Sequence, residues 1–436
     1  MSYFKEWGFS QPPFTTDPLP GTALGSRLLI GREAEVRALL DRLSTPPKMA
    51  ALEAMNGLGK TSLTNVAAYR SLHHHLQTGT GPVFVPCRVL FQLTADEQID
   101  SFLDKVYGGL AETIASGLEE LERADLYIVR PGPVERWLSL PSRPTCQAGP
   151  SRAGLGPLQQ SATHAGERTA SRREVEALLR YIFPQPTDGG IVCVLENLEL
   201  LRYSLDTMRF LEELRDPLFR IPGVRWVLCG SHGVVQGVAR SPRLDGTLHT
   251  PIRLECIDTS NALEILTSRL REFSASPQRP RLPLKPQAFV FLYDIMGGNL
   301  RSTMSELTDY CVWVHERHPE IDKAPDHQEL FQRWLLETSE EQYLLTRDLV
   351  RPTAWRDFDR IVKLGGSINL RDALRSADAR SEADLRAAIN ELVYTSLLSD
   401  GMRRPKDRDE VYFITSKGRK VNFARKRESR LSRASQ

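Results

Sequence analysis

The stretch from Ala51 to Leu63, ALEAMNGLGKTSL, decides the fold of this chain. It begins with the end of an apolar strand, passes through a tight glycine-containing loop, and opens a helix at Gly59-Lys60-Thr61-Ser62. This is the layout of a P-loop, in which backbone N–H groups surround phosphates, the lysine reaches the β- and γ-phosphates, and the threonine hydroxyl binds Mg²⁺. The positive end of the helix dipole adds to the attraction for an anion. The stretch therefore predicts a nucleotide site.

One position departs from the P-loop pattern, because Ala54 stands where the first glycine is expected. Alanine fits there if its backbone keeps a negative φ, since only a positive φ favours glycine. A fortuitous turn is the alternative, and the flanking apolar strand and amphipathic helix argue against it. The residues expected to bind the nucleotide in this loop are Ala54, Met55, Asn56, Gly57, Leu58, Gly59, Lys60, Thr61 and Ser62.

Composition limits the class of protein. The chain has 436 residues, 41% of them hydrophobic and 26% charged, which predicts a soluble protein of two or three domains. It has no apolar run of about 18 residues and no basic-then-apolar N-terminus, so we expect a cytoplasmic protein without a membrane partner. Cys193, Cys229 and Cys311 lie inside apolar runs, which favours buried thiols over a metal site. A net charge of +2 means that nucleic-acid binding would need a local patch.

Two further apolar runs end in polar residues. Ile191–Leu195 is followed by Glu196 and Asn197, and Val224–Cys229 is followed by Gly230, Ser231 and His232. Buried parallel strands have such continuous apolar runs because helices cover both faces of the sheet. The carboxyl ends of parallel strands share one edge, where ligands bind. We therefore predict an α/β fold with a doubly wound, mostly parallel sheet and polar side chains gathered beside the P-loop.

The order of elements predicts several domains. We expect an irregular N-terminal arm at 1–25, a nucleotide-binding core at 26–257 with a disordered insert at 130–170, a small helical domain at 258–335, a winged helix-turn-helix domain at 339–424 and a basic tail at 425–436. The expected elements include a strand at 82–93, helices at 96–121, 172–183 (capped by Ser171), 340–349, 370–377 and 381–397, a turn at Asp400-Gly401 and a strand at 411–415.

Together these stretches resemble the AAA+ ATPases, in particular their origin-recognition-like and related signal-transducing branch. Five pieces carry the resemblance in the family's order. They are Ile30-Gly31-Arg32-Glu33 beside the adenine, Ala54–Thr61 as Walker A, Leu195–Glu199 in place of Walker B, Ser231 as sensor 1, and Gly297–Arg301 as the lid segment with the sensor-2 arginine. The resemblance implies ATP and Mg²⁺ as ligands, a helical lid and a C-terminal winged helix. Gly31, Arg32 and Arg301 join the expected nucleotide-binding residues.

The resemblance also implies catalytic roles. Lys60, Glu196, Asn197, Ser231 and Arg301 occupy the family's catalytic positions, and Thr61 with Glu196 would hold Mg²⁺. The family commonly has Asp-Glu where this chain has Glu196-Asn197. An amide cannot accept a proton, and general-base help contributes roughly 10²–10⁴ in rate. We therefore expect slow hydrolysis, with Glu199 able to substitute only if the strand end bulges.

The partners are less constrained. Arg240 or Arg243 could be an arginine finger for a neighbouring subunit in a homo-oligomer or larger complex, or a surface arginine. Double-stranded DNA is the expected partner of the winged helix, although the candidate recognition helix Glu382–Thr395 carries acidic residues. The expected phosphate contacts are the basic residues Arg403, Arg404, Lys406, Arg408, Lys417, Arg419, Lys420, Arg425, Lys426, Arg427, Arg430 and Arg433.

Two functions thus remain open. One is a nucleotide-dependent protein that binds or loads onto DNA. The other is a signalling ATPase whose winged helix contacts protein and whose oligomerisation depends on ATP. His73-His74-His75 does not suggest a metal site, because adjacent helical residues point about 100° apart.

Overall fold

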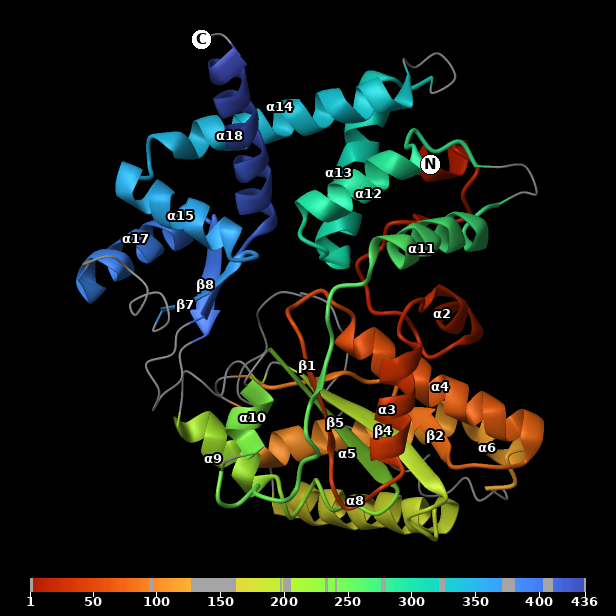
Figure 1. The fold of residues 1–436 in the computed structure, drawn as a ribbon. Helices are drawn as coiled ribbons and strands as arrows, with labels where there is room; N and C mark the ends of the chain where they lie inside the picture. The colour runs from red at the N-terminus through yellow and green to blue at the C-terminus, as the bar shows by residue number, and fades with distance from the viewer. Residues whose placement is uncertain are drawn as a thin grey trace. The chain divides into compact units, whose positions relative to one another are not determined.

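A parallel β-sheet forms the centre of one of the two compact units in this computed structural model (Figure 1). This sheet unit spans Pro18–Leu254, and a helical unit combines Met1–Asp17 with Glu255–Gln436. The structure describes residues 3–94, 97–126, 162–196, 198, 205–231, 234–239, 241–275, 280–320, 326–370, 381–402 and 411–434.

The sheet unit alternates strands and helices. In chain order its elements are α2 (Ala23–Leu28), α3 (Glu33–Leu43), β1 (Ala50–Glu53), α4 (Lys60–Thr78), β2 (Val83–Pro86), β3 (Phe91–Gln92), α5 (Ile99–Ser116), α6 (Leu118–Arg123), α8 (Ala162–Ile182), β4 (Gly189–Glu196), α9 (Leu205–Glu213), β5 (Val224–Gly230), α10 (Val234–Ala239) and β6 (Ile252–Arg253). The strand order is β2-β4-β5-β1-β6, with β3 also paired to β4.

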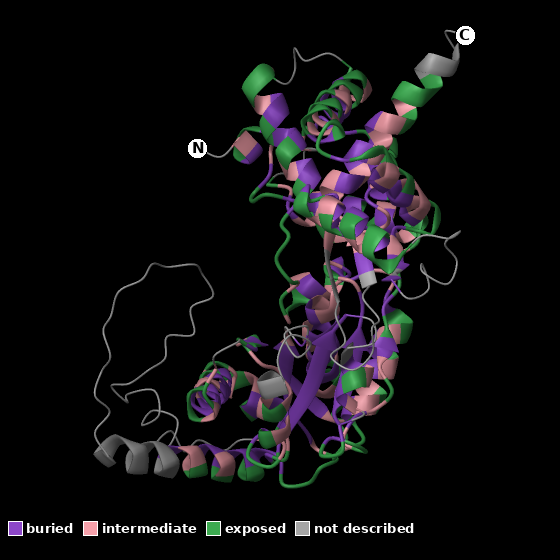
Figure 2. Ribbon diagram, turned by 90° about the vertical axis from the view of Figure 1, so that its left-hand side faces the viewer, coloured by how far each residue is buried: buried purple, intermediate pink, exposed green. Residues whose placement is uncertain are grey.

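Every ladder between these strands is parallel, which confirms the predicted fold class. The strands β1 and β5 are buried along their whole length, as the purple centre of Figure 2 shows. One face packs on α3 and α4 through side chains such as Leu52 and Val194. On the other face, Phe91 contacts Trp226 of β5 and Phe102 of α5. Because both faces are covered, apolar residues fill consecutive strand positions.

Some expected boundaries in this unit were wrong. The segment 82–93 forms two short strands, and the helix expected at 96–121 is divided into α5 and α6 at Gly117. The helix expected to begin after Ser171 begins at Ala162, so Ser171 lies within α8 rather than at its start. Residues 130–161 of the expected insert lie outside the described part of the chain, and residues 162–170 belong to α8.

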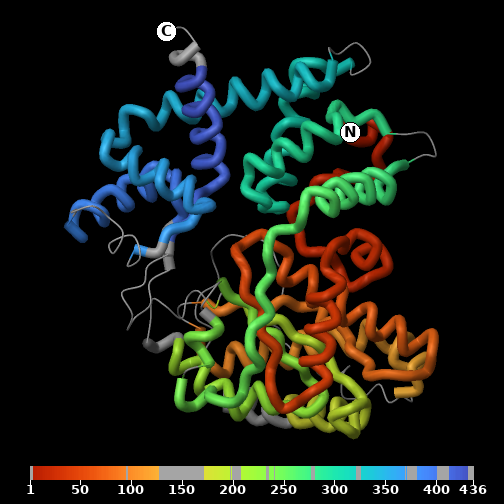
Figure 3. Tube along the Cα trace, in the orientation of Figure 1, coloured from red at the N-terminus to blue at the C-terminus, as the bar shows by residue number. Residues whose placement is uncertain are grey.

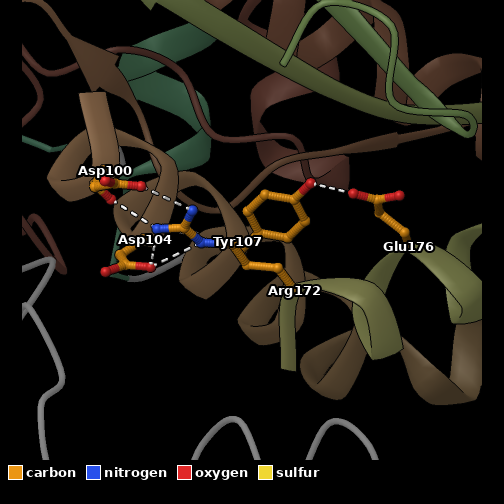
Figure 4. Close-up of polar contacts among 5 residues, drawn as sticks. All are labelled: Asp100, Asp104, Tyr107, Arg172 and Glu176. Carbon is orange, nitrogen blue, oxygen red and sulfur yellow. Dashed lines mark hydrogen bonds and ion pairs between the residues drawn. The ribbon is translucent and has the colours of Figure 1, made fainter. Parts of the chain in front are cut away.

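Polar contacts fasten α8 to α5 (Figure 4). Arg172 Nη2 lies 2.6 Å from Asp104 Oδ1, and Arg172 Nη1 lies 3.2 Å from Asp100 Oδ1. Burial opposes the charge on Arg172, but the hydrogen bonds and charges of both aspartates outweigh it and raise the pKa of the guanidinium. The Tyr107 hydroxyl donates to Glu176 Oε1 at 2.5 Å, and burial together with this carboxylate raises the pKa of Tyr107. These contacts fix the helix that follows the undescribed segment.

The helical unit contains the remaining elements. They are α1 (Tyr3–Glu6), α11 (Thr259–Glu272), α12 (Pro286–Ile295), α13 (Leu300–Arg317), α14 (His327–Arg347), α15 (Pro352–Lys363), β7 (Ser367–Asn369), α17 (Glu382–Tyr394), β8 (Leu398–Met402), β9 (Val411–Ile414) and α18 (Ser416–Ala434). The strands form an antiparallel sheet in the order β7-β9-β8.

Residues 3–17 of the expected arm belong to the helical unit and contribute to its core. Phe4, Trp7 and Phe9 are buried. Phe9 forms a β-bridge with Ser274, just after α11, and Figure 3 shows the red N-terminal trace beside this helix. Arg269 of α11 donates from Nη1 to Pro13 O at 3.0 Å, and burial lowers its pKa to about 10. The expected arm at 1–25 is therefore divided between the two units.

The C-terminal part also differs from expectation. Residues 340–349 belong to the longer helix α14, and β7 and β8 were not predicted. The Asp400-Gly401 pair lies within β8, where the register with β9 shifts. Residues 371–377 of the helix expected at 370–377 lie outside the described residues. A shared core that includes Phe358, Leu392 and Tyr412 joins α15 and α17 to the small sheet.

The basic tail expected at 425–436 is instead the second half of α18, a continuous helix from Ser416 to Ala434. Arg425 forms an ion pair with Asp359, and its guanidinium carbon lies 4.2 Å from the centroid of the Trp355 ring. Arg427 Nη1 lies 3.0 Å from Glu340 Oε1. The sequence of this helix is strongly basic, and two of its charges, on Arg425 and Arg427, pair with acidic residues of α15 and α14.

Candidate nucleotide-binding site

The loop between β1 and α4 has the backbone that its glycines predict. Gly57 and Gly59 have φ values of +88° and +87°, in the region that favours glycine. An added Cβ at Gly59 would meet only one atom within 4 Å, at 3.9 Å, so φ rather than space requires glycine. Among the described residues, Asp125 and Ser396 are the non-glycine positions with positive φ, so Ala54 has the negative φ expected for alanine.

Lys60, the first residue of α4, folds its side chain into this loop. Its Nζ donates to Ala54 O at 3.0 Å and to Met55 O at 3.5 Å. At the same place the first N–H groups of α4 have no partner within the helix. A cation and a set of free backbone donors therefore face one small volume, which is the chemistry that phosphate oxygens require.

Thr61 and Glu196 come together although 135 residues separate them. The Thr61 hydroxyl donates to Glu196 Oε1 in a short hydrogen bond. Glu196 is the last residue of β4, and β5 lies between β4 and β1. A hydroxyl and a carboxylate beside a lysine provide the oxygen ligands that Mg²⁺ binds together with phosphates. The residues present thus fit a magnesium ion.

Arg32 supports the loop from the side. It follows Gly31, whose φ is +71°, and it is buried. Its Nη1 donates to Glu35 Oε1 at 2.8 Å, and its Nη2 donates to Leu58 O at 3.4 Å. Arg32 therefore contacts the loop itself, between its two glycines.

Ser62 has a role that the sequence did not reveal. Its Oγ accepts the backbone N–H of Leu19 at 3.0 Å, and Asn65 Nδ2 donates to Leu19 O at 3.1 Å. Two side chains one turn apart on α4 thus hold the backbone of the segment that enters the sheet unit at Pro18. Leu19 and Asn65 were missed because backbone contacts of this kind leave no sequence pattern.

The end of β1 carries a second residue that was missed. Glu53 pairs with Gly230 of β5 and is fully buried, and its Oε1 accepts the backbone N–H of Gln236 at 3.1 Å. Arg253 Nε lies 4.0 Å from the other carboxylate oxygen. This carboxylate holds the first turn of α10, the helix that follows the buried Ser231. The position of Glu53, a charged residue at the end of an apolar strand, was the sequence feature that could have identified it.

The remaining expected residues belong to other elements or lie outside the description. Asn197, Glu199 and Arg240 are outside the described residues. Arg243 is exposed in the segment after α10. Arg301 belongs to the helical unit, where it is exposed in the first turn of α13.

Most of the basic residues expected to contact DNA from α18 are used within the helical unit. Those with contacts to other elements are Lys417 (to Thr395 O), Arg419 (to Gly365 O), Lys420 (to Glu306), Arg425 (to Asp359) and Arg427 (to Glu340). Lys426 and Arg430 are exposed. The side chains of Arg403, Arg404, Lys406, Arg408 and Arg433 are outside the description. Five of the eight α18 residues expected to contact DNA thus make contacts within the helical unit, and the DNA contact stays a prediction.

Two other expectations concern cysteine and histidine. Cys193, Cys229 and Cys311 are buried, as predicted, and burial raises the pKa of Cys193 and of Cys311. The described part of the chain contains no group of three or more His, Cys, Asp or Glu side chains that could hold a metal ion. Within the same residues, every helix is too short or too polar to span a membrane.

Comparisons with known proteins give structural likenesses only. Neither the protein-family models nor the curated protein sequences contain a match. Among solved structures, the Aeropyrum pernix ORC2 protein in ADPNP and ADP complexes has a TM-score of 0.47 at 13% identity, covering 96% of this chain and 97% of that one. A Walker-type ATPase of Pyrococcus abyssi has a TM-score of 0.45 at 15% identity, with 95% and 99% covered.

A third solved structure, the Aeropyrum pernix ORC1 protein in complex with DNA, has a TM-score of 0.42 at 14% identity, with 97% of both chains covered. With TM-scores below 0.5 and such low identities, the likeness concerns the fold alone.

Proposed function

We propose that this chain binds ATP with Mg²⁺ in the loop between β1 and α4 and that the nucleotide state acts as a switch. The contact between Thr61 and Glu196, beside the Lys60 ammonium, is the observation that carries the proposal. Residues from the start of α4 and the end of β4 meet there with the cation and oxygen ligands that a magnesium–phosphate group needs.

Each residue has a separate task in this proposal. Lys60 exchanges its contacts with the loop carbonyls for phosphate oxygens and neutralises their charge. Thr61 and Glu196 hold the Mg²⁺, which when bound neutralises charge on the terminal phosphates. Arg32 keeps the loop in place through its contact with the carbonyl of Leu58. Hydrolysis is slow, because the residue after Glu196 is an amide that cannot accept a proton from water.

The binding step is tested by calorimetry with ATP and Mg²⁺. Lys60→Ala should weaken ATP binding by at least about 30-fold, the effect of losing a desolvated charge pair of about 2 kcal/mol. Lys48→Ala, at an exposed lysine outside the loop, is the control and should bind as the wild type does. Equal affinities of the two variants would contradict the proposed site.

We further propose that α15, β7, α17, β8 and β9 form a winged helix that contacts double-stranded DNA. The supporting feature is the exposed face of α17, where Ala383, Ala387, Asn390 and Tyr394 recur at helical spacing. Tyr394 is 85% exposed. Asparagine pairs with adenine and small apolar side chains contact the thymine methyl group in the major groove, so this face suits base contacts.

A signalling ATPase whose winged helix binds protein is the second candidate. Two observations favour it. The basic residues of α18 are largely paired internally, and the first turn of α17 carries Glu382 and Asp384, which repel phosphates. On this view ATP binding changes the oligomeric state without DNA.

Two measurements separate the candidates. Fluorescence anisotropy with duplex DNA at increasing salt should show binding that weakens with salt and falls in an Asn390→Ala, Tyr394→Ala variant. Tyr181→Ala, at an exposed tyrosine of the sheet unit, is the control. If the wild type ignores DNA at low salt but changes mass with ATP and Mg²⁺, the signalling candidate replaces the first.

A further inference from the structure

Two helices of the helical unit end in the same kind of turn. α12 is followed by Gly297-Gly298, with φ of +66° and +76°, and α15 by Gly365-Gly366, with φ of +89° and +92°. In each turn the first glycine N–H donates to the carbonyl three residues back, at 3.0 and 3.2 Å. The second donates to the carbonyl five residues back, at 3.0 and 2.9 Å. Each helix thus ends in a left-handed backbone conformation, which glycine adopts without the steric penalty of a Cβ atom.

Arg419, in the first turns of α18, lies between these two turns. A Cβ added to Gly297 would lie 2.6 Å from its guanidinium carbon, and one added to Gly366 would lie 2.1 Å from Nη2. Nη2 donates to Gly365 O at 3.4 Å. The guanidinium therefore fills the space that both missing side chains leave. A cation is favoured there because the carboxyl end of a helix carries partial negative charge, and here two such ends converge on one arginine.

The next residue, Lys420, forms a second contact between α18 and the helices around the first glycine turn. Lys420 Nζ lies 2.8 Å from Glu306 Oε2 of α13, and both side chains are at most 10% exposed. One turn further, Phe423 meets Phe291 of α12 edge to face, with ring centroids 5.9 Å apart. These contacts fix α18 to both helices that flank the first glycine turn.

That turn sets the start of α13. After Gly297-Gly298, Asn299 caps the helix by accepting the N–H of Ser302 at 3.0 Å, and Arg301 follows in the first helical turn. Gly297 O also accepts from Cys256 Sγ at 3.5 Å. The backbone that bears Arg301 is therefore held by contacts to the turn and not by the arginine itself.

We propose that Arg419 is a positioning residue that joins the turn before α13 to the turn after α15, so that a shift of one turn is transmitted to the other. It makes the C-terminal sheet and α17 respond to the position of α13 through one side chain. The connection needs no change in the cores of the two helical groups, because both turns are built of glycine.

The first test needs no nucleotide. Hydrogen exchange of the full-length protein is followed in peptides that cover 297–303. Arg419→Ala should speed exchange there about tenfold or more, and Arg419→Met, which keeps the stem, serves if the alanine variant does not fold. The control Arg427→Ala removes an arginine from the same helix and should leave this peptide unchanged. Equal exchange in Arg419→Ala and the control overturns the inference.

The second test perturbs the far turn in the same experiment. Gly366→Ala would place a Cβ 2.1 Å from Arg419 Nη2, so it should speed exchange in 297–303 as well as at its own turn, and this distant effect should be absent in the Arg419→Ala background. A distant effect that does not occur, or that persists without Arg419, overturns the inference.

Discussion

Replacing Lys420 with methionine should loosen the helical unit strongly, whereas replacing its partner as well should not. The two charges lie 2.8 Å apart with side-chain exposures of 7% and 10%. At an effective dielectric constant of about 20 their attraction is about 6 kcal/mol. The desolvation of each ion costs several kcal/mol, so the intact pair is close to neutral for stability.

The single variant Lys420→Met removes the attraction and leaves Glu306 buried without its partner. Breaking a buried pair in this way costs about 3–5 kcal/mol. Since about 1.4 kcal/mol is a factor of ten, amide protection in α13 and α18 should fall by about 10²- to 10⁴-fold. The double variant Lys420→Met, Glu306→Met has two apolar side chains of similar length, and its stability should lie within about 1 kcal/mol of the wild type or above it.

Hydrogen exchange of peptides 300–317 and 416–430 in the full-length protein gives these free energies directly. Lys426→Met, at an exposed lysine of the same helix, should change protection little. The reasoning is refuted if Lys420→Met costs less than about 1 kcal/mol, or if the double variant is as unstable as the single one.

Three other outcomes are expected. Gly298→Ala should destabilise the protein more than Gly79→Ala, as measured by thermal unfolding of the two variants. Both glycines have positive φ, but a Cβ at Gly298 would lie 2.7 Å from Cys256 Cβ, whereas a Cβ at Gly79 would have no atom within 4 Å. Tyr107→Phe should cost about 1.5–3 kcal/mol in the opening free energy of α8, measured by hydrogen exchange, since a hydrogen bond to a carboxylate is lost. Asn197→Glu should raise ATP turnover, by up to roughly 10²–10⁴, in a phosphate-release assay, and unchanged turnover would show that a missing base does not limit the rate.

The sheet could be predicted from the sequence because its signals are local. Ala51–Leu63 contains a strand, a loop and a helix start within 13 residues, and Ile191–Leu195 is apolar without a break. A strand buried on two faces appears as a run of consecutive apolar residues, and a loop with positive φ appears as glycines at fixed positions. Both patterns can be recognised within a few neighbouring residues. The meeting of Thr61 with Glu196 followed from the rule that parallel strands end at one edge.

The errors share a different cause. The internal pairing of the basic residues in α18 was missed because their acidic partners, Glu306, Glu340 and Asp359, lie 66 to 114 residues away. Serine is a common helix N-cap residue, but Ser171 lies within a helix that begins earlier. In both places tertiary contacts overrode local propensity, and such contacts cannot be inferred from one sequence.

In the candidate site, the predicted residues also belong to a local pattern, and the missed residues contact distant segments. Lys60 and Thr61 have fixed spacing from the glycines, so the pattern identifies them. The hydroxyl of Ser62 holds Leu19, and the carboxylate of Glu53 holds α10. These residues support the loop through backbone groups of distant segments, and any small polar or acidic residue would have been equally plausible there.

The path of the chain between the two units also orders events during synthesis. Phe4, Trp7, Phe9 and Phe14 are synthesised before helices α11 and α13, which follow residue 255 and belong to the same unit as these aromatic residues. The sheet unit is an uninterrupted segment and can complete its core before that point. The four aromatic side chains therefore stay without their final neighbours while the segment up to residue 255 is synthesised. Apolar surface exposed during folding promotes aggregation, and a truncated product that ends near residue 254 would carry a folded sheet and an unprotected apolar segment.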